Sequence, residues 1–155
     1  MLLDLGIEGP LRQDSVGNSP LMYATRGGDQ EECVHTLMVA DSDPGQVDPY
    51  MMFPQGPRSD RPAHVAARLG YENCLRAMAE VHPDCLREPS SGGELPAYEA
   101  ARRGHANVLR CIYELGAGET LSAPREDGRT PAHAAAISGN AHILWDLYTR
   151  SVGWA

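Results

Sequence analysis

The same ten-residue pattern occurs four times along this chain, at a spacing that few folds accommodate. Each copy holds a proline, an alanine four positions after it and a glycine eight positions after it. The copies occupy residues 19–28, 61–70, 95–104 and 130–139, and their prolines are 42, 34 and 35 positions apart. Such a period is typical of proteins built from stacked supersecondary units, none of which buries its apolar face alone.

Each copy predicts a short helix that begins at its proline and ends at its glycine. A proline is tolerated at the first helical position, because its missing N–H would have no partner there. Ser19 and Thr130, which precede two of the prolines, are favourable N-cap residues. The alanines allow a neighbouring helix to approach closely, and the glycine supplies the left-handed turn that ends the helix.

A second, more apolar helix is predicted after each glycine. Its apolar residues recur at positions i, i+1, i+4 and i+5, which places them on one face of a helix of about three turns. These residues are Cys74, Leu75, Met78 and Ala79 in the second copy, Val108, Leu109, Ile112 and Tyr113 in the third, and Ile143, Leu144, Leu147 and Tyr148 in the fourth. In the first copy, with a slip of one residue, they are Cys33, Val34, Leu37 and Met38.

With these motifs the sequence resembles the ankyrin repeat family. The segment 130–135, Thr-Pro-Ala-His-Ala-Ala, is the best match to the family signature T-P-L-H-x-A, and residues 61–70 follow closely. The resemblance covers about residues 12–151. It implies an all-α fold, an ankyrin repeat solenoid of four helix–turn–helix repeats with finger loops, in which the first helices and the fingers line a concave surface.

The resemblance also implies a single ankyrin repeat domain over residues 1–155. Its units are an N-terminal half-cap at 1–18, repeat 1 with a long finger insertion at 19–59, repeat 2 at 60–93, repeat 3 at 94–128 and repeat 4, a C-terminal cap, at 129–155. Residues 3–7 resemble the end of a second helix, so the chain begins either with a natural half-cap or as a fragment of a longer array. Asp146, at the position of Ala77 and Cys111, is a polar residue that suits a terminal repeat.

The two middle repeats depart from the family pattern at their helix starts. In ankyrin repeats a threonine hydroxyl and a histidine ring tie the helix start to the preceding loop. Here Arg61 and Leu95 stand in place of the threonine, and Tyr98 stands in place of the histidine in the third copy. Since the loss of an N-cap costs about 0.5–2 kcal/mol, we expect the middle of the array to be less rigid than a consensus array.

The step between the first two copies is about nine residues longer than the period of the family. Four prolines in this insertion, at 44, 49, 54 and 57, exclude a helix and predict a long finger or extended loop. The insertion carries an apolar run, Tyr50, Met51, Met52 and Phe53. Either these side chains bind a partner from an exposed loop, or they fold back onto the first repeat.

Composition and charge argue against several classes of protein. With 13 basic and 21 acidic residues in 155, the formal charge is −8, which disfavours general binding to nucleic acids or anionic membranes. The four cysteines form no dense framework, and there is no leader segment or apolar stretch long enough to span a membrane. We therefore expect a cytoplasmic or nuclear protein, and a monomer.

The sequence offers little catalytic or cofactor chemistry. No phosphate-binding glycine loop occurs, and the six histidines lack metal-ligand spacing, so we expect no cofactor and no metal site. His82-Pro83-Asp84-Cys85 is the one compact cluster, and a thiol-dependent enzyme centred on Cys85 is the alternative to a non-enzymatic protein. The other three cysteines, Cys33, Cys74 and Cys111, lie on the apolar faces and are expected to act as small hydrophobic residues.

Alignment of the copies places Arg26, Arg68, Arg102 and Ile137 at one equivalent position, and Arg103 follows Arg102. In a stacked array these arginines would form a ladder along the inner face. The ladder either binds an acidic segment of a partner through bidentate pairing, or covers neighbouring alanines as part of the scaffold.

By resemblance to the family, the function is protein–protein recognition without catalysis, as an adaptor or stoichiometric inhibitor. A scaffold fragment of a longer ankyrin protein is a further alternative. The expected partner-binding residues are those of the ladder, those of the long finger, and a tyrosine near a helix turn: Arg26, Arg68, Arg102, Arg103, Tyr50, Met51, Met52, Phe53 and Tyr71.

Overall fold

Eight α-helices in four pairs account for most of the chain that the computed structural model describes, namely residues 15, 20–40, 42–43, 46–47, 61–90 and 92–153. The pairs are α1 (Pro20–Arg26) with α2 (Glu31–Ala40), α4 (Pro62–Leu69) with α5 (Glu72–Val81), α6 (Pro96–Arg103) with α7 (Ala106–Glu114), and α8 (Pro131–Ile137) with α9 (Ala141–Gly153). Short 3-10 helices, η2 (Pro83–Leu86) and η3 (Gly118–Leu121), follow α5 and α7. The predicted helix–turn–helix repeats are therefore confirmed.

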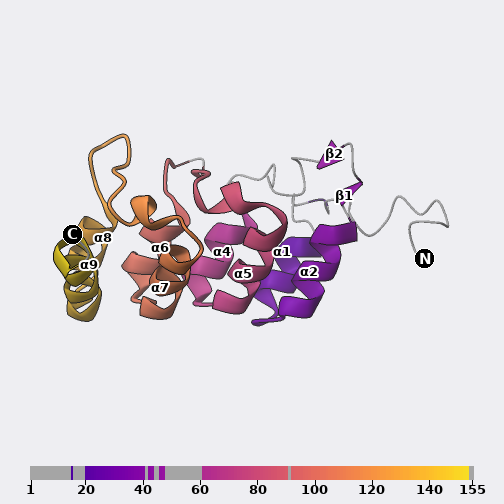
Figure 1. Cartoon of the computed structure of the whole chain (residues 1–155), viewed down its shortest axis with the longest axis horizontal. Helices are drawn as coiled ribbons and strands as arrows, with labels where there is room; N and C mark the ends of the chain where they lie inside the picture. Colours follow the sequence, from indigo (N-terminus) through magenta and orange to yellow (C-terminus); the bar gives the residue numbers. More distant parts are fainter. Residues whose placement is uncertain are drawn as a thin grey trace.

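The helix pairs stack in chain order into one elongated array (Figure 1). The first helices of the repeats form one row, in which α4 packs between α1 and α6, and α6 packs between α4 and α8. The second helices form the other row, in which α5 packs between α2 and α7. We call these the first-helix row and the second-helix row.

The first helices begin at their prolines as predicted, and α4 and α6 end at their glycines, whereas α1 ends at Arg26 and α8 at Ile137, each two residues before its glycine. Pro62, Pro96 and Pro131 each open a helix, and Gly70 ends α4 with φ +81°, a left-handed conformation that favours glycine. Only the last of these three helix starts, at Thr130, has the side-chain cap expected of the family. There the backbone N–H of Thr130 lies 3.1 Å from Nδ1 of the following histidine.

The core is a continuous spine of small and aliphatic side chains between the two rows. Alanines of the first helices and apolar residues of the second helices are fully buried together: Ala66, Ala67, Ala100, Ala101, Ala135, Cys74, Leu75, Met78, Val108, Leu109, Ile112 and Ile143. The prediction for Cys33 is wrong, because this side chain is exposed, whereas its neighbour Val34 is fully buried. Cys33 lies in the first turn of α2.

Side chains of the third and fourth repeats bind the end of the first helix in the repeat before them. Nε2 of His105, just before α7, lies 2.9 Å from the carbonyl oxygen of Arg68 near the end of α4. In the next repeat, Asn140 donates to the carbonyls of Ala101 and Arg102 at 3.1 and 3.0 Å. These bonds satisfy carbonyl groups that have no partner within their own helix.

The finger loops leave the array on one side (Figure 1). The loops after η2 and η3 share a hairpin turn, in which Ser90 N–H donates to the carbonyl of Glu94 and Arg125 N–H to that of Arg129, each at 2.8 Å. In the insertion after α2, strands β1 (Ser42–Asp43) and β2 (Gln46–Val47) pair antiparallel. The expected contact residues Tyr50, Met51, Met52 and Phe53 lie outside the described residues.

None of the described helices combines the length and the apolar character needed to cross a membrane.

Candidate functional site

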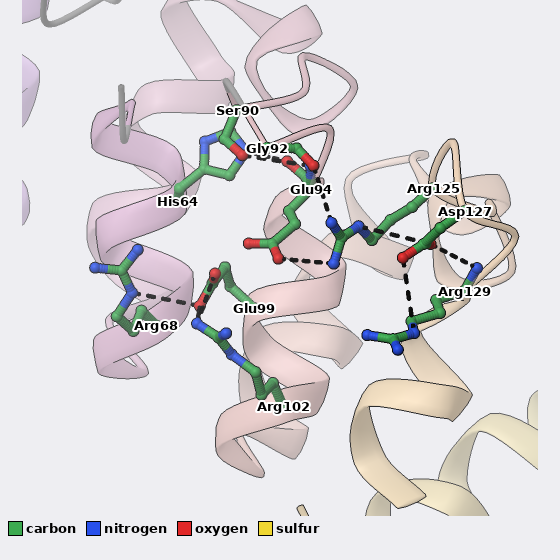
Figure 2. A network of polar contacts seen from close by, with 10 residues as sticks. All are labelled: His64, Arg68, Ser90, Gly92, Glu94, Glu99, Arg102, Arg125, Asp127 and Arg129. Carbon is green, nitrogen blue, oxygen red and sulfur yellow. Dashed lines mark hydrogen bonds and ion pairs between the residues drawn. The ribbon is translucent and has the colours of Figure 1, made fainter. Parts of the chain in front are cut away.

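The most buried charged side chain in the described part of the first-helix row is Glu99 on α6, with 2% of its surface exposed. Its carboxylate receives a hydrogen bond from Nε of Arg68 on α4 at 3.3 Å. The guanidinium of Arg102, one turn further along α6, lies 2.9 Å from both carboxylate oxygens. Two of the arginines expected in the ladder are thus brought together on one glutamate (Figure 2).

The surroundings of Glu99 favour its ionised form. Burial acts to raise the pKa of this carboxyl, but a hydrogen bond with Glu94 and the charges of Arg68 and Arg102 outweigh it and lower the pKa. Arg68 and Arg102 keep 24% and 39% of their side chains exposed, so both guanidinium groups also reach the surface. The site is a buried anion with two cations that border on solvent.

Glu94, in the finger before α6, is the second acid of the site. Burial raises its pKa, and the hydrogen bond and negative charge of Glu99 raise it further. Arg125 of the next finger donates to its carboxyl at 3.0 Å. The pKa values of the two acids are therefore shifted in opposite directions, that of Glu94 upward and that of Glu99 downward.

Further contacts fix both fingers above the first-helix row. Nε2 of His64 on α4 lies 2.7 Å from the carbonyl oxygen of Glu94, so the signature histidine binds the following finger. Arg125 also donates to the carbonyl of Gly92 at 3.1 Å, and its guanidinium lies 5.2 Å from the centre of the Tyr98 ring. Tyr98, which stands where the family has histidine, thus packs against a cation of the next finger.

Comparison with known proteins agrees with this architecture. The family model described as ankyrin repeats (three copies) matches residues 21–121 and 63–151, which together span most of the chain. The chain belongs to the ankyrin repeat family. Ankyrin repeats are generally protein–protein interaction modules and are typically non-catalytic. No curated protein matches the chain.

Of the ladder residues of this ankyrin repeat array, Arg68 and Arg102 share the carboxylate of Glu99. Arg26, at the end of α1, and Arg103, at the end of α6, are exposed. The fourth position is occupied by Ile137, whose side chain is 70% exposed. The first-helix row therefore presents arginines over repeats 1 to 3 and an apolar residue in repeat 4.

Glu99 is the functional candidate that sequence reasoning missed. It occupies the position that Val65 holds in the second copy and Ala134 in the fourth, both of which are buried. An acid at an apolar position, three residues before an arginine of the ladder, was the available signal. Tyr71, a predicted contact residue, is half-buried at the start of α5 and packs against the core.

The surroundings of Cys85 do not suit a nucleophile. The side chain is 1% exposed in η2, and burial, followed by the charges of Glu88 and Asp84, raises its pKa to about 12. The thiol is therefore protonated near neutral pH, whereas a thiolate is the reactive form. The nearby base, His82, pairs through Nε2 with Glu88 at 3.0 Å. The described residues also contain no group of three His, Cys, Asp or Glu side chains that could hold a metal ion.

Proposed function

We propose that this ankyrin repeat protein is a non-catalytic adaptor or stoichiometric inhibitor, located in the cytoplasm or nucleus, that binds an acidic segment of a partner protein. The observation that carries the proposal is the pair Arg68 and Arg102, held by the buried Glu99 at 3.3 and 2.9 Å. Arg103, next to Arg102 at the end of α6, is exposed and adds a third guanidinium group. These arginines would attract an acidic segment, on a chain whose formal charge is −8.

The pairing of Arg68 and Arg102 with Glu99 favours binding of a partner, because these side chains have less conformational entropy left to lose when the partner binds. A free arginine side chain loses rotamer freedom when it pairs with a carboxylate of a partner, at about 0.5–1.5 kcal/mol for each side chain. Glu99 already restricts Arg68 and Arg102, and both remain partly exposed. A partner carboxylate therefore meets guanidinium groups that are already in place, in a geometry suited to charge-assisted hydrogen bonds.

The long finger is the second element of the proposal. Tyr50, Met51, Met52 and Phe53 are apolar residues of the insertion between the first two repeats of the sequence, and apolar loops on a rigid scaffold are common binding devices. An acidic segment with apolar residues at one end would match both elements.

The test compares two charge reversals on the same repeat. Arg103→Glu changes an exposed residue of α6 in the first-helix row, and Arg110→Glu changes an exposed residue of α7 in the second-helix row. Each variant and the wild type are immobilised and used to capture proteins from the native cell, at low and high salt. We expect Arg103→Glu to lose salt-sensitive partners that Arg110→Glu retains, since the electrostatic term is screened by salt.

A third variant, in which residues 44–57 are shortened, tests the finger separately. Equal retention of partners by Arg103→Glu and Arg110→Glu would refute the role of the first-helix row. Retention by the shortened variant would refute the role of the finger. The melting temperature of each variant is measured in parallel, so that a loss of folding is not taken for a loss of binding.

A further inference from the structure

The last repeat ends the described array with a large apolar surface. Four exposed side chains of α8 and α9 form it, with exposed fractions of 70%, 36%, 67% and 58%: Ile137, Leu144, Trp145 and Tyr148. The rings of Trp145 and Tyr148 lie 6.0 Å apart. We call these four residues the end face.

Comparison with the inner repeats shows which way the end face points. Ile137 occupies the position of Arg68, which reaches forward from α4 to Glu99 in the following repeat. Trp145 occupies the position of Arg76 on α5, which donates to Glu114 of the following repeat at 2.6 Å. Both positions therefore point away from the preceding repeats, toward the place where a fifth repeat would stack.

The remaining two positions agree. Tyr148 occupies the position of Tyr113, whose ring is covered by the guanidinium of Arg150 from the following repeat, at 5.2 Å from the ring centre. Leu144 occupies the position of Leu109, which is fully buried. Three residues of the end face, Ile137, Trp145 and Tyr148, thus stand where an inner repeat contacts the next repeat, and Leu144 stands where an inner repeat has a buried side chain.

The chemistry of the end face differs from that of the inner repeats and of a usual terminal repeat. Where inner repeats reach their neighbour with Arg68 and Arg76, the last repeat has Ile137 and Trp145. Terminal repeats generally have a polar outer face. Asp146, the polar residue expected there, corresponds to Cys111, whose thiol contacts the carbonyl of Glu72 in the preceding repeat at 3.8 Å.

We propose that the end face binds a second copy of this chain, end to end and about a two-fold axis. None of its four residues carries a charge, so two copies bring no like charges together across it. The exposed parts of these side chains amount to on the order of 400 Å². Two copies would bury about 800 Å² from these four side chains alone, which is the size of a small interface that forms only at high concentration.

The proposal is independent of the function proposed above. Arg68, Arg102 and Arg103 lie on α4 and α6, outside the end face of α8 and α9, so a dimer through the end face leaves them accessible in both copies. Two such surfaces in one particle would raise avidity for a partner that is itself repeated. The monomer expected from the sequence would then be the form present at low concentration.

The experiment is sedimentation equilibrium of the complete 155-residue chain over a range of concentrations up to about 1 mM. The test variant is Ile137→Arg combined with Trp145→Arg, which installs the arginines that α4 and α5 carry at these positions. The matched control is Leu69→Arg, because Leu69 is 41% exposed on α4 and corresponds to Arg103 on α6. Melting temperatures at low concentration show that each variant is folded.

We expect the wild type and Leu69→Arg to dimerise with the same affinity and the double variant to dimerise at least about 30-fold more weakly. The melting temperature of the wild type should also rise with concentration, as it does for any folded state that associates. A wild type that stays monomeric up to about 1 mM would overturn the proposal, and the end face would then belong to another occupant. A double variant that dimerises as well as the wild type would overturn it too.

Discussion

Replacement of Glu99 by glutamine removes the charge of the buried carboxyl while keeping its volume, so no cavity accompanies the change. Breaking a fully buried ion pair costs about 3–5 kcal/mol, because a charge is left without compensation. Here Arg68 and Arg102 keep 24% and 39% of their side chains exposed and regain water in part. We therefore expect Glu99→Gln to lower the free energy of unfolding by about 2 kcal/mol. For a chain of this length, that corresponds to a fall of about 4–8 °C in melting temperature.

The same variant has a predictable dependence on pH. The pKa of Glu99 is lowered in the folded state, so its stabilisation is complete above the unfolded value of 4.5 and is lost as the pH falls through the lowered pKa. The pKa of Glu94 is raised, partly by Glu99, so the wild type loses stability as the pH rises from 4.5 through that raised pKa. In Glu99→Gln the pKa of Glu94 is raised less, so the variant loses less stability than the wild type over this second pH range. The difference between the two proteins should therefore be largest near pH 4.5 and smaller on either side.

The assay is urea unfolding of both proteins, followed by circular dichroism at several pH values. The control is Glu114→Gln, which removes the acid of an exposed pair with Arg76 at 2.6 Å. Solvent screens that pair, so the control should leave the unfolding midpoint unchanged. If the stability of Glu99→Gln matched that of the control at every pH, the role assigned to the buried carboxyl would be wrong.

Three further predictions concern single residues elsewhere. Leu95→Thr should raise the melting temperature, because Leu95 is an N-cap with extended backbone and no side-chain hydrogen bond, and a lowered value would contradict the assigned helix start. Gly70→Ala should lower the melting temperature by more than Gly116→Ala does. Both glycines have φ above +80°, so an alanine is strained at either position. A Cβ at Gly70 would in addition stand 2.7 Å from Nδ1 of His105, whereas nothing lies within 4 Å of a Cβ at Gly116. Iodoacetamide near neutral pH should label Cys33 quickly and Cys85 only after unfolding, as measured by mass spectrometry, because Cys33 is exposed and Cys85 is buried with a raised pKa. Rapid labelling of Cys85 in the folded protein would instead support a thiol-dependent enzyme.

The sequence predicted the helical framework well because its signals are local. Pro62, Pro96 and Pro131 open their helices, and Gly70 and Gly104 end theirs, since a missing N–H and a positive φ depend on the residue itself. The apolar faces of the second helices followed from periodicity. Cys33 was the exception: its counterpart Cys74 contacts a carbonyl group of the repeat before it, so burial at this position depends on a neighbouring repeat and not on the periodicity of the helix.

The candidate site was predicted only in part because its key contact is not local. The spacing of the repeats brought Arg68 and Arg102 into one row, but nothing in the spacing indicated an anion between them. Glu99 lies on α6 at an apolar position, and its burial depends on α4, which lies next to it only when the repeats stack. Likewise, the side of α9 that carries Trp145 could be assigned only from contacts across the inner junctions.

The hydrogen bonds from His105 to the end of α4 and from Asn140 to the end of α6 bear on how this chain folds during its synthesis. Each joins groups 37 to 39 residues apart, and the donor of the bond is always translated last. At the usual rate of elongation, roughly 2–8 s pass between the synthesis of the end of a first helix and the synthesis of the side chain that binds its carbonyl groups. The array should therefore fold one repeat behind its own translation, and a free chain that ends just before His105 should leave α4 more open to protease than the full chain does.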